Sequence, residues 1–354
     1  MKTYYHSLDG LRALAVGVVL IAHAGSPFPR SGSVGVEIFF VLSGFLITGI
    51  LSREFQESGA VSRKNFYIRR LLRLTPALLL AVALFAVLFS LTHHYFPTRE
   101  VAIALTYTAN WAEALWNLDL GAMAHCWTLA TEEQFYFLWP FVIVALEKTI
   151  KTTKGKALAL TTIALALAGY RAALVGSYSP ARIYFGLDTH MDGLVMGSAL
   201  AYFAAILRTS EKSRSTSYHI LSWIVVPASL FVLLALMYLF KWDSTGLHQY
   251  GFFLAALSSV AIILDLTLSP FSLIQKPLSL PPLVYLGKIS YGLYLFHYPL
   301  YHFITEVMPD ASFLVKAPLK IGLSILVAAL SFHLVEVKFL TLKKHFAKGK
   351  NATE

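Results

Sequence analysis

The sequence has little charge and almost no cysteine, and each shortage excludes a class of protein. Only 14% of its 354 residues are charged, whereas an ordinary soluble domain has about 25%. The single cysteine, Cys126, excludes an intrachain disulfide and argues against a cysteine-based metal site. Apolar residues fill the chain instead: 57% are hydrophobic, and the mean hydropathy is +0.64. The composition therefore predicts an integral membrane protein.

Ten hydrophobic runs are long enough to cross a bilayer, since each crossing helix needs about 20 mostly apolar residues. The sequence predicts an all-α, polytopic bundle of about ten transmembrane helices. The predicted spans are residues 8–25, 34–51, 74–92, 131–148, 157–175, 188–207, 219–240, 249–268, 287–307 and 317–340. We expect the first to be a retained helix rather than a signal peptide, because charged residues interrupt it and no clean cleavage site follows.

An eleventh apolar stretch, 101–118, contains polar residues such as Asn110 and Glu113. Cytoplasmic loops collect lysine and arginine. If this stretch does not cross, 21 basic residues fall on the side of the two termini and six on the other. We therefore predict a re-entrant or interfacial segment here, with both termini in the cytoplasm. The predicted organisation is one membrane domain, residues 1–345, and a short cytoplasmic tail, 346–354.

The first span, LDGLRALAVGVVLIAHAG, carries Arg12 near its start and His23 near its end. Eleven residues make almost three helical turns, so both side chains lie on one face, about 16 Å apart along the axis. A guanidinium near the membrane interface and an imidazole deeper in the bilayer suit a long anionic substrate that enters the bundle end-on. The alternative is that Arg12 reaches lipid phosphate and His23 hydrogen-bonds a neighbouring helix.

The segment RKNFYIRRLLR, which leads into the third span, packs Arg69, Arg70 and Arg73 into about one turn. Arg70 and Arg73 share a face because they are three residues apart. Guanidinium groups suit phosphate. The cytoplasmic excess of basic residues explains how many there are, but not why they crowd at a helix mouth. We therefore interpret them as a phosphate site.

The segment CWTLATEEQFYFLWP opens a span with two adjacent acids, Glu132 and Glu133. Neighbours on a helix point about 100° apart, so only one glutamate can face the bundle centre and the other needs its own partner. The alternative places both acids in solvent at the outer interface, among aromatic residues. The segment's further polar or interfacial candidates are Trp127, Gln134 and Tyr136.

A third polar group starts the sixth predicted span, in DTHMDGLVMG. Asp188 and Asp192 are four residues apart and are expected to share a face, with His190 between them. Such close spacing on one helix is poor for a closed metal site, so we expect no metal. His297 lies among aromatic residues in ISYGLYLFHYPL, and its isolation favours a structural hydrogen bond.

Together these segments resemble membrane acyltransferase family 3, the bacterial integral-membrane O-acyltransferases. The resemblance covers nearly the whole chain. Its motifs, in the family's order, are SLDGLR with Asp9, Arg12 and the following His23; VGVEIFFVLSGFLIT at 34–48; IRRLLRLTP at 68–76; WTLATEEQFYFLWP at 127–140; and ISYGLYLFHYP at 289–299. The sequence departs at Thr128, where the family usually has serine, and at His190, where it often has arginine.

The resemblance implies transfer of an acyl group, usually acetyl, from cytoplasmic acetyl-CoA to a hydroxyl outside. Arg12, Arg69, Arg70 and Arg73 would hold the phosphates of CoA while its arm threads the bundle toward His23. No tightly bound cofactor is expected. The expected partners are acetyl-CoA, a glycan or glycolipid acceptor and membrane lipids, with no nucleic acid, in the cytoplasmic (inner) membrane.

The chemistry needs a base near the reacting hydroxyl, and histidine titrates in the right range. We expect His23 to be that base, with Glu132 or Glu133 orienting it; an acyl-histidine relay is the alternative. The acceptor stays open among lipopolysaccharide, exopolysaccharide, peptidoglycan, a glycolipid and a small molecule. Outer loops, chiefly 92–130, are expected to select it. A transporter is the competing class, although a transporter needs no phosphate cradle.

Overall fold

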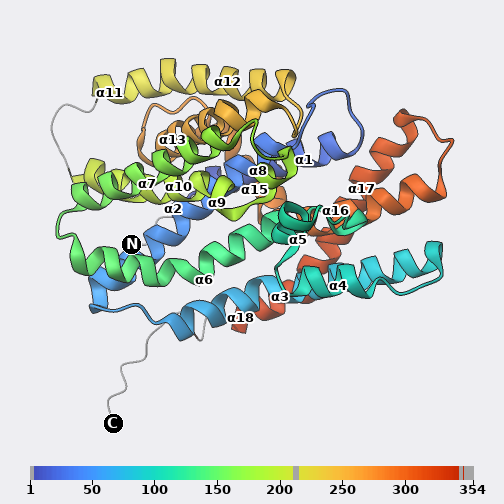
Figure 1. Ribbon diagram of the computed structural model, residues 1–354. Helices are drawn as coiled ribbons and strands as arrows, with labels where there is room; N and C mark the ends of the chain where they lie inside the picture. Colours follow the sequence, from blue (N-terminus) through green and yellow to red (C-terminus); the bar gives the residue numbers. More distant parts are fainter. Residues whose placement is uncertain (1–3, 210–214, 343–345, 347–354) are drawn as a thin grey trace, which may run out of the picture.

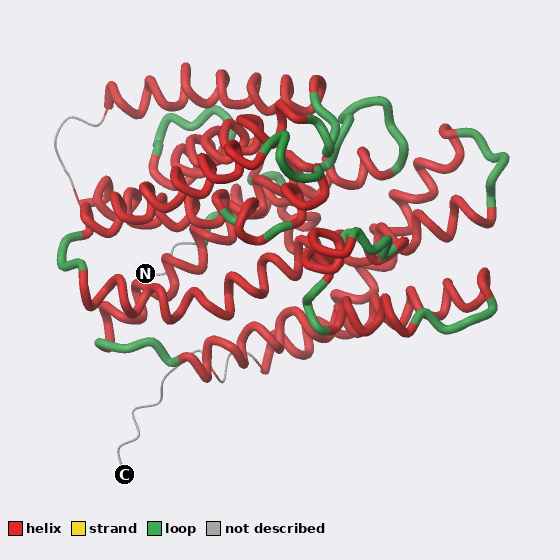
Figure 2. The backbone as a smooth tube through the Cα atoms, viewed as in Figure 1, coloured by secondary structure: helices red, strands yellow, loops and turns green. Residues whose placement is uncertain are grey.

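The computed structural model describes residues 4–209, 215–342 and 346. These residues form helices and connecting loops with no β-strand among them (Figures 1 and 2). The predicted all-α membrane bundle is confirmed. The basic residues at positions 2, 212, 214, 343, 344, 348 and 350, which contribute to the predicted charge bias, and most of the predicted tail lie outside the described residues.

Ten long helical segments correspond to the ten predicted spans. They are α1 His6–His23, α2 Ser33–Ser58, α3 Arg63–His93, α6 Cys126–Thr149, α7 Thr153–Leu174, α10 Asp192–Thr209, α11 Ser215–Ile220 continuing through η2 Leu221–Val225 and α12 Val226–Leu239, η3 Leu247–Gly251 with α13 Phe252–Leu268, α16 Ser290–Val307, and α17 Phe313–Ser331 with η4 Phe332–Glu336 and α18 Val337–Leu342. Seven of them are long and apolar enough to cross a membrane by length and composition. The other three, α6, α10 and α16, carry the polar groups described below.

Successive long segments run back and forth across the bundle, with α12 along one edge in Figure 1 and α3 along the opposite edge. Both described ends of the chain reach the same end of the bundle. Arg208, at the close of α10, donates to Tyr5, and Arg69, at the start of α3, donates to the carbonyl of Phe346. This arrangement agrees with an even number of crossings. Which side of the membrane holds this end stays a prediction.

Short helices fill the space between the long ones. They are α4 Thr98–Leu105, α5 Ala109–Trp116, η1 Gly121–Met123, α8 Pro180–Phe185, α9 Leu187–His190, α14 Gln275–Leu278 and α15 Pro281–Lys288. The ambiguous stretch 101–118 is therefore two eight-residue helices, each about 12 Å long and too short to cross a bilayer. Their lengths agree with the prediction that this stretch does not cross.

Glycines allow the backbones of neighbouring helices to pack in direct contact near the polar residues described below. A Cβ on Gly44 would come within 1.8 Å of the Leu194 carbonyl oxygen, and one on Gly197 within 2.0 Å of the Val41 oxygen. The backbones of α2 and α10 therefore approach too closely for any larger residue. Gly287 of α15 packs in the same way on Asp9 of α1. These contacts fix α1 and α2, which carry much of the polar site.

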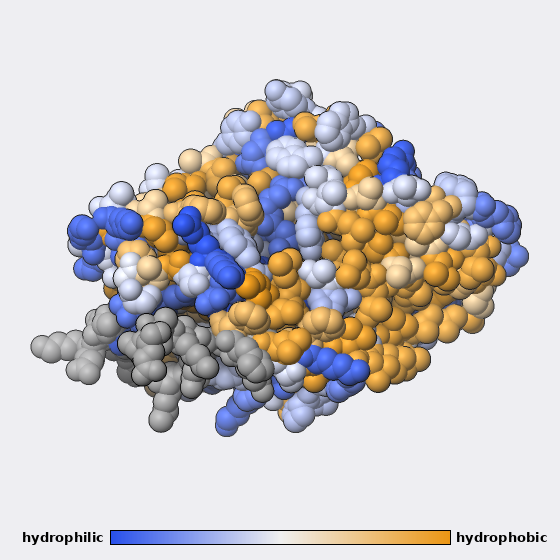
Figure 3. Space-filling view, turned by 90° about the horizontal axis from the view of Figure 1, so that it is seen from below, coloured by the Kyte–Doolittle hydropathy of each residue, from blue (hydrophilic) through white to orange (hydrophobic). Residues whose placement is uncertain are grey.

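The outer surface suits a lipid environment. Figure 3 shows apolar side chains over a broad part of one flank, with polar side chains gathered toward its two ends. Helix α3 alone exposes Leu71, Leu79, Val87 and Leu91. Exposed aliphatic side chains in such numbers would be costly in water, so the chain is a multi-pass membrane protein.

Candidate active site

One cavity of about 180 Å³ opens among α1, α2, α3, α6 and α16, and we call it the arginine cavity. Its lining includes Arg12, Arg70, Arg73, Glu132 and Tyr136. Two helices, α1 and α3, thus bring three of the four predicted phosphate-binding arginines to one space.

The arginines of this cavity have N–H groups that make no hydrogen bond with any described residue of the protein. The Nε of Arg12 donates to the Ser290 hydroxyl over 3.2 Å. Arg70 pairs with Glu133 at 3.0 Å and stacks on the ring of Tyr136, but its Nε is buried without a partner. Arg73 has no hydrogen bond or ion pair within the described part of the chain. An anion in the cavity would find unpaired guanidinium N–H groups.

Arg69 is the exception among the predicted phosphate ligands. It pairs with Glu54 at 3.4 Å and donates to the Phe346 carbonyl, and it does not line the cavity. Arg69 and Arg70 point about 100° apart on α3, and Glu54 and Phe346 hold Arg69 on the side away from the cavity. The structure therefore does not bring Arg69 to the predicted site.

The two glutamates of α6 have separate partners, as the sequence predicts. Glu132 faces the arginine cavity and accepts a hydrogen bond from Ser43 at 2.5 Å, whereas Glu133 pairs with Arg70. Neither glutamate contacts His23. The expectation that one of them orients His23 is therefore wrong, because both point toward the arginine end of α6.

A second cavity, of about 380 Å³, contains His23, and we call it the histidine cavity. His23 is exposed within it, and its lining includes His125, Glu113, Trp127 and Tyr298. Val36 and Tyr294 line both cavities. The Tyr294 hydroxyl accepts from Thr128 at 2.7 Å and donates to the His125 carbonyl at 3.0 Å, which holds its ring at the junction. The hydroxyl of Thr128 serves this contact as a serine would.

A directed hydrogen-bond chain sets the protonation of His23. The Nδ1 of His297 lies 2.7 Å from the carbonyl oxygen of Tyr294, which can only accept, so Nδ1 carries the proton. In neutral His297 the Nε2 is then an acceptor, and the Nδ1 of His23, 2.9 Å away, must donate to it. The Nε2 of His23 is left with a free lone pair. His297 thus makes the predicted structural hydrogen bond, and its partner is His23.

Sequence reasoning missed His125 and Glu113 as members of the site. His125 is 3% exposed, its Nε2 donates to the Leu295 carbonyl at 3.1 Å, and its Nδ1 has no partner. Glu113 comes from the non-crossing helix α5. The available signals were a histidine directly before Cys126 and an acid inside an apolar stretch.

The polar residues around the sixth span do not form one cluster. Asp188 pairs with Arg182 at 2.6 Å, and Asp192 pairs with the buried Arg171. The expectation that the two aspartates share a face is wrong, because α9 ends at His190 and α10 starts at Asp192. No group of metal-ligating side chains occurs in the chain as far as the structure describes it.

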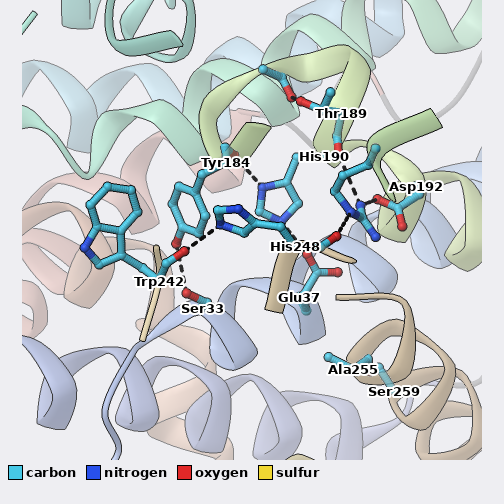
Figure 4. A network of polar contacts seen from close by, with 12 residues as sticks. Ser33, Glu37, Tyr184, Thr189, His190, Asp192, Trp242, His248, Ala255 and Ser259 are labelled. Carbon is cyan, nitrogen blue, oxygen red and sulfur yellow. Dashed lines mark hydrogen bonds and ion pairs between the residues drawn. The ribbon is translucent and has the colours of Figure 1, made fainter. Parts of the chain in front are cut away.

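His190 belongs to a buried network behind the histidine cavity (Figure 4). Its Nδ1 donates to the Tyr184 carbonyl at 2.6 Å, and its Nε2 lies 2.6 Å from Glu37. Tyr184 also bonds Ser33 at 3.1 Å, and both line the cavity. Glu37, within the second family motif, was not singled out from the sequence. This network fixes one wall of the cavity.

The remaining predicted residues make contacts that hold helices or cavity walls in place. Gln134 accepts from the Trp111 indole at 3.1 Å and donates to the Tyr107 carbonyl at 2.8 Å, which ties α5 to α6. Trp127 stacks on His190 and lines the histidine cavity. Asp9 accepts from Tyr4 at the arginine end and lines neither cavity.

Comparison with known proteins agrees with this geometry. The family model described as "Acyltransferase domain" matches residues 5–333. The chain is 31% identical over 348 residues to the peptidoglycan O-acetyltransferase OatA of Listeria monocytogenes, covering 95% of this chain and 56% of that protein. It is 32% identical over 350 residues to the O-acetyltransferase OatA of Staphylococcus aureus strain NCTC 8325, covering 94% and 57%.

The chain thus spans little more than half the length of these relatives. No solved structure matches it. The family match nevertheless extends over all the helices that build both cavities. The chain belongs to this membrane acyltransferase family, as the resemblance of its motifs predicted.

Proposed function

We propose that the protein is a membrane O-acyltransferase that moves an acetyl group from acetyl-CoA to a hydroxyl of a cell-surface glycan. The carrying observation is the meeting of two cavities at Val36 and Tyr294, with guanidinium groups in one and His23 in the other. The names of the relatives support the acetyl group and the glycan acceptor. The excess of basic residues near the arginine end supports a cytoplasmic donor side in a bacterial inner membrane.

The donor fits the arginine cavity by charge and by length. Arg12, Arg70 and Arg73 would bind the phosphates of CoA, since guanidinium groups suit phosphate oxygens. The thin pantetheine arm would then pass the junction. Arg12 and His23 are about 16 Å apart along α1, so the arm would bring the thioester to the imidazole.

His23 would act as the general base. Its free Nε2 accepts the proton of the acceptor hydroxyl as the oxygen attacks the thioester carbonyl. The C–S bond then breaks, and the imidazolium returns the proton to the CoA sulfur. His297 supports this step by accepting from Nδ1 throughout. In the alternative, the same Nε2 attacks the thioester and carries the acetyl group before the acceptor takes it.

His23→Ala tests the assignment. We expect acetyl transfer to fall about 10²–10⁴-fold, the usual contribution of a general base, while acetyl-CoA binding persists. His94→Ala, in the loop after α3 and outside both cavities, is the matched control. Normal transfer by the His23→Ala protein refutes the assignment. Mass spectrometry of the wild type with acetyl-CoA and no acceptor separates the two mechanisms, since only the relay leaves acetyl on His23.

A further inference from the structure

The histidine cavity contains several hydrogen-bonding groups that the protein leaves unfilled. The Nε2 of His23 and the Nδ1 of His125 each carry a lone pair that accepts no hydrogen bond from any residue that the structure describes. Glu113 adds a carboxyl group with no hydrogen bond or ion pair in the described part of the chain, and one of its oxygens is buried. Unfilled buried polar groups are costly, so their presence in one cavity points to a ligand that supplies hydrogen bonds.

The same cavity presents no lysine or arginine side chain to an anion among the described residues that line it. The basic residues that adjoin lining residues in sequence, Arg30, Arg182 and Lys241, do not themselves line it, and Arg182 pairs with Asp188. A carboxylate or phosphate moved into this space would lose its hydration without gaining a counter-charge. The arginine cavity, a few residues away, has the opposite composition.

The remaining walls are flat and aromatic. Trp127, Tyr184, Phe185, Trp242 and Tyr298 all line the histidine cavity. Aromatic rings pack against apolar faces such as the C–H face of a sugar ring, while polar groups at the edge take hydroxyls. Aromatic walls with unfilled polar groups suit a sugar better than a lipid chain.

We infer that the histidine cavity binds an uncharged, hydroxyl-bearing sugar ring, and that Glu113 holds this ring by a hydrogen bond while His23 takes the proton of the reacting hydroxyl. This inference rests on the proposed function and adds the charge class of the acceptor and a residue that binds it. It excludes acceptors whose reacting sugar carries its own carboxylate.

Three tetrasaccharides test the charge class with purified protein and acetyl-CoA. The first contains only N-acetylglucosamine, the second alternates N-acetylglucosamine with glucuronate, and the third is the methyl ester of the second. Mass spectrometry measures O-acetylation. Fragmentation assigns each acetyl group to its ring, and we expect the neutral rings and the esterified ring to be acetylated at least tenfold faster than the free glucuronate ring. Equal or faster acetylation of the free glucuronate ring overturns the inference, as does acetyl-CoA turnover with none of the three acetylated.

Variants of Glu113 test its role. Glu113→Ala should raise the KM for the neutral sugar about tenfold, the size of one lost hydrogen bond, and leave the KM for acetyl-CoA unchanged. Glu113→Gln keeps the shape and the hydrogen bond and should stay within about threefold of wild type. Glu306→Gln, at the C-terminal end of α16 and outside both cavities, is the control. An unchanged acceptor KM in Glu113→Ala, or a loss confined to kcat, contradicts the assignment.

Failure of this inference differs from failure of the proposed function. If acetyl-CoA is not the donor, the protein neither binds nor turns over acetyl-CoA with any sugar. If only the acceptor assignment is wrong, acetyl-CoA is consumed but the order of the three sugars or the response to Glu113→Ala differs from that expected.

Discussion

The arginine cavity and the histidine cavity share Val36 and Tyr294, yet their charged groups are almost opposite. The first presents three guanidinium groups that have unpaired N–H donors. The second presents lone pairs, the carboxyl groups of Glu113 and Asp119, and aromatic walls, with no lysine or arginine among the described lining residues. This contrast within one bundle indicates that an acyl donor and its acceptor can be distinguished by charge, each in its own cavity, before they react. In the proposed function, the polyanionic donor would bind in the arginine cavity and the uncharged acceptor in the histidine cavity.

The largest expected effect comes from blocking the junction. Val36→Trp would place an indole where the two cavities meet, so transfer should fall about a thousandfold while each cavity keeps its own ligand groups. Overpacking costs about 1–3 kcal/mol, which acetyl-CoA affinity and thermal unfolding will reveal. Retained acetyl-CoA binding with lost transfer supports a shared path. Near-normal transfer would show that the cavities do not communicate at Val36.

Charge reversal in the arginine cavity should act on the donor alone. Arg73→Glu removes a charge-assisted contact of about 1.5–3 kcal/mol, so the Kd for acetyl-CoA should rise by one to two orders of magnitude. The KM for the acceptor should not change. Arg69→Ala is the matched control, because Arg69 pairs with Glu54 outside the cavity. Equal losses in Arg69→Ala and Arg73→Glu would remove the distinction between these two arginines.

The hydrogen bond between the two histidines should affect kcat more than binding. His297→Leu removes the acceptor for the Nδ1 of His23, and we expect kcat to fall about tenfold to a hundredfold with little change in either KM. His297→Gln restores an acceptor and should recover most of the activity. Rescue by glutamine separates orientation from packing, since leucine and glutamine have similar volumes. Equal kcat in the two variants would exclude an orienting role.

The smallest effect expected is a pH dependence in the histidine cavity. Burial, and then the nearby Asp119, raise the pKa of Glu113 to about 8, so the carboxyl is mostly protonated at neutral pH and ionises as pH rises. If the neutral form binds the sugar, the kcat/KM for a neutral acceptor should fall about threefold between pH 7.5 and 8.5.

Glu113→Gln provides the reference, because glutamine does not titrate and other groups around it do. His23, His125, Asp119 and Tyr298 face the same cavity and stay in both proteins. The ratio of wild type to Glu113→Gln therefore isolates Glu113. A ratio that does not change across this interval would show that the charge of Glu113 has no effect on acceptor use.

Much of the arginine cavity could be predicted from the sequence because the positions of its residues depend on local helix geometry. Arg12 and His23 lie on one helix, and Arg70 and Arg73 lie on another, so helical periodicity already relates each pair. The pair Glu132 and Glu133 was likewise predicted to divide between two partners, and it does. Arg69 was the exception, because Glu54 and the Phe346 carbonyl, which helical periodicity does not place, hold it outside the cavity.

The histidine cavity could not be predicted in this way because its lining residues come from distant segments of the sequence. His23 and His297 are 274 residues apart, and Glu113 enters the cavity from a short helix that crosses nothing. His190 and Asp192 are only two residues apart in the sequence but have separate partners, since the helix breaks between them.

The sequence by itself determined that this chain is an all-α membrane protein, which helices are long enough to cross and which side chains share a helix face. These properties follow from hydropathy and from the 3.6-residue turn, and neither needs a neighbour. Only the tertiary structure decided which polar groups pair across helices and which remain unfilled. Close helix packing at Gly44, Gly197 and Gly287 sets those distances, and hydrogen bonds depend on distance to within a few tenths of an ångström.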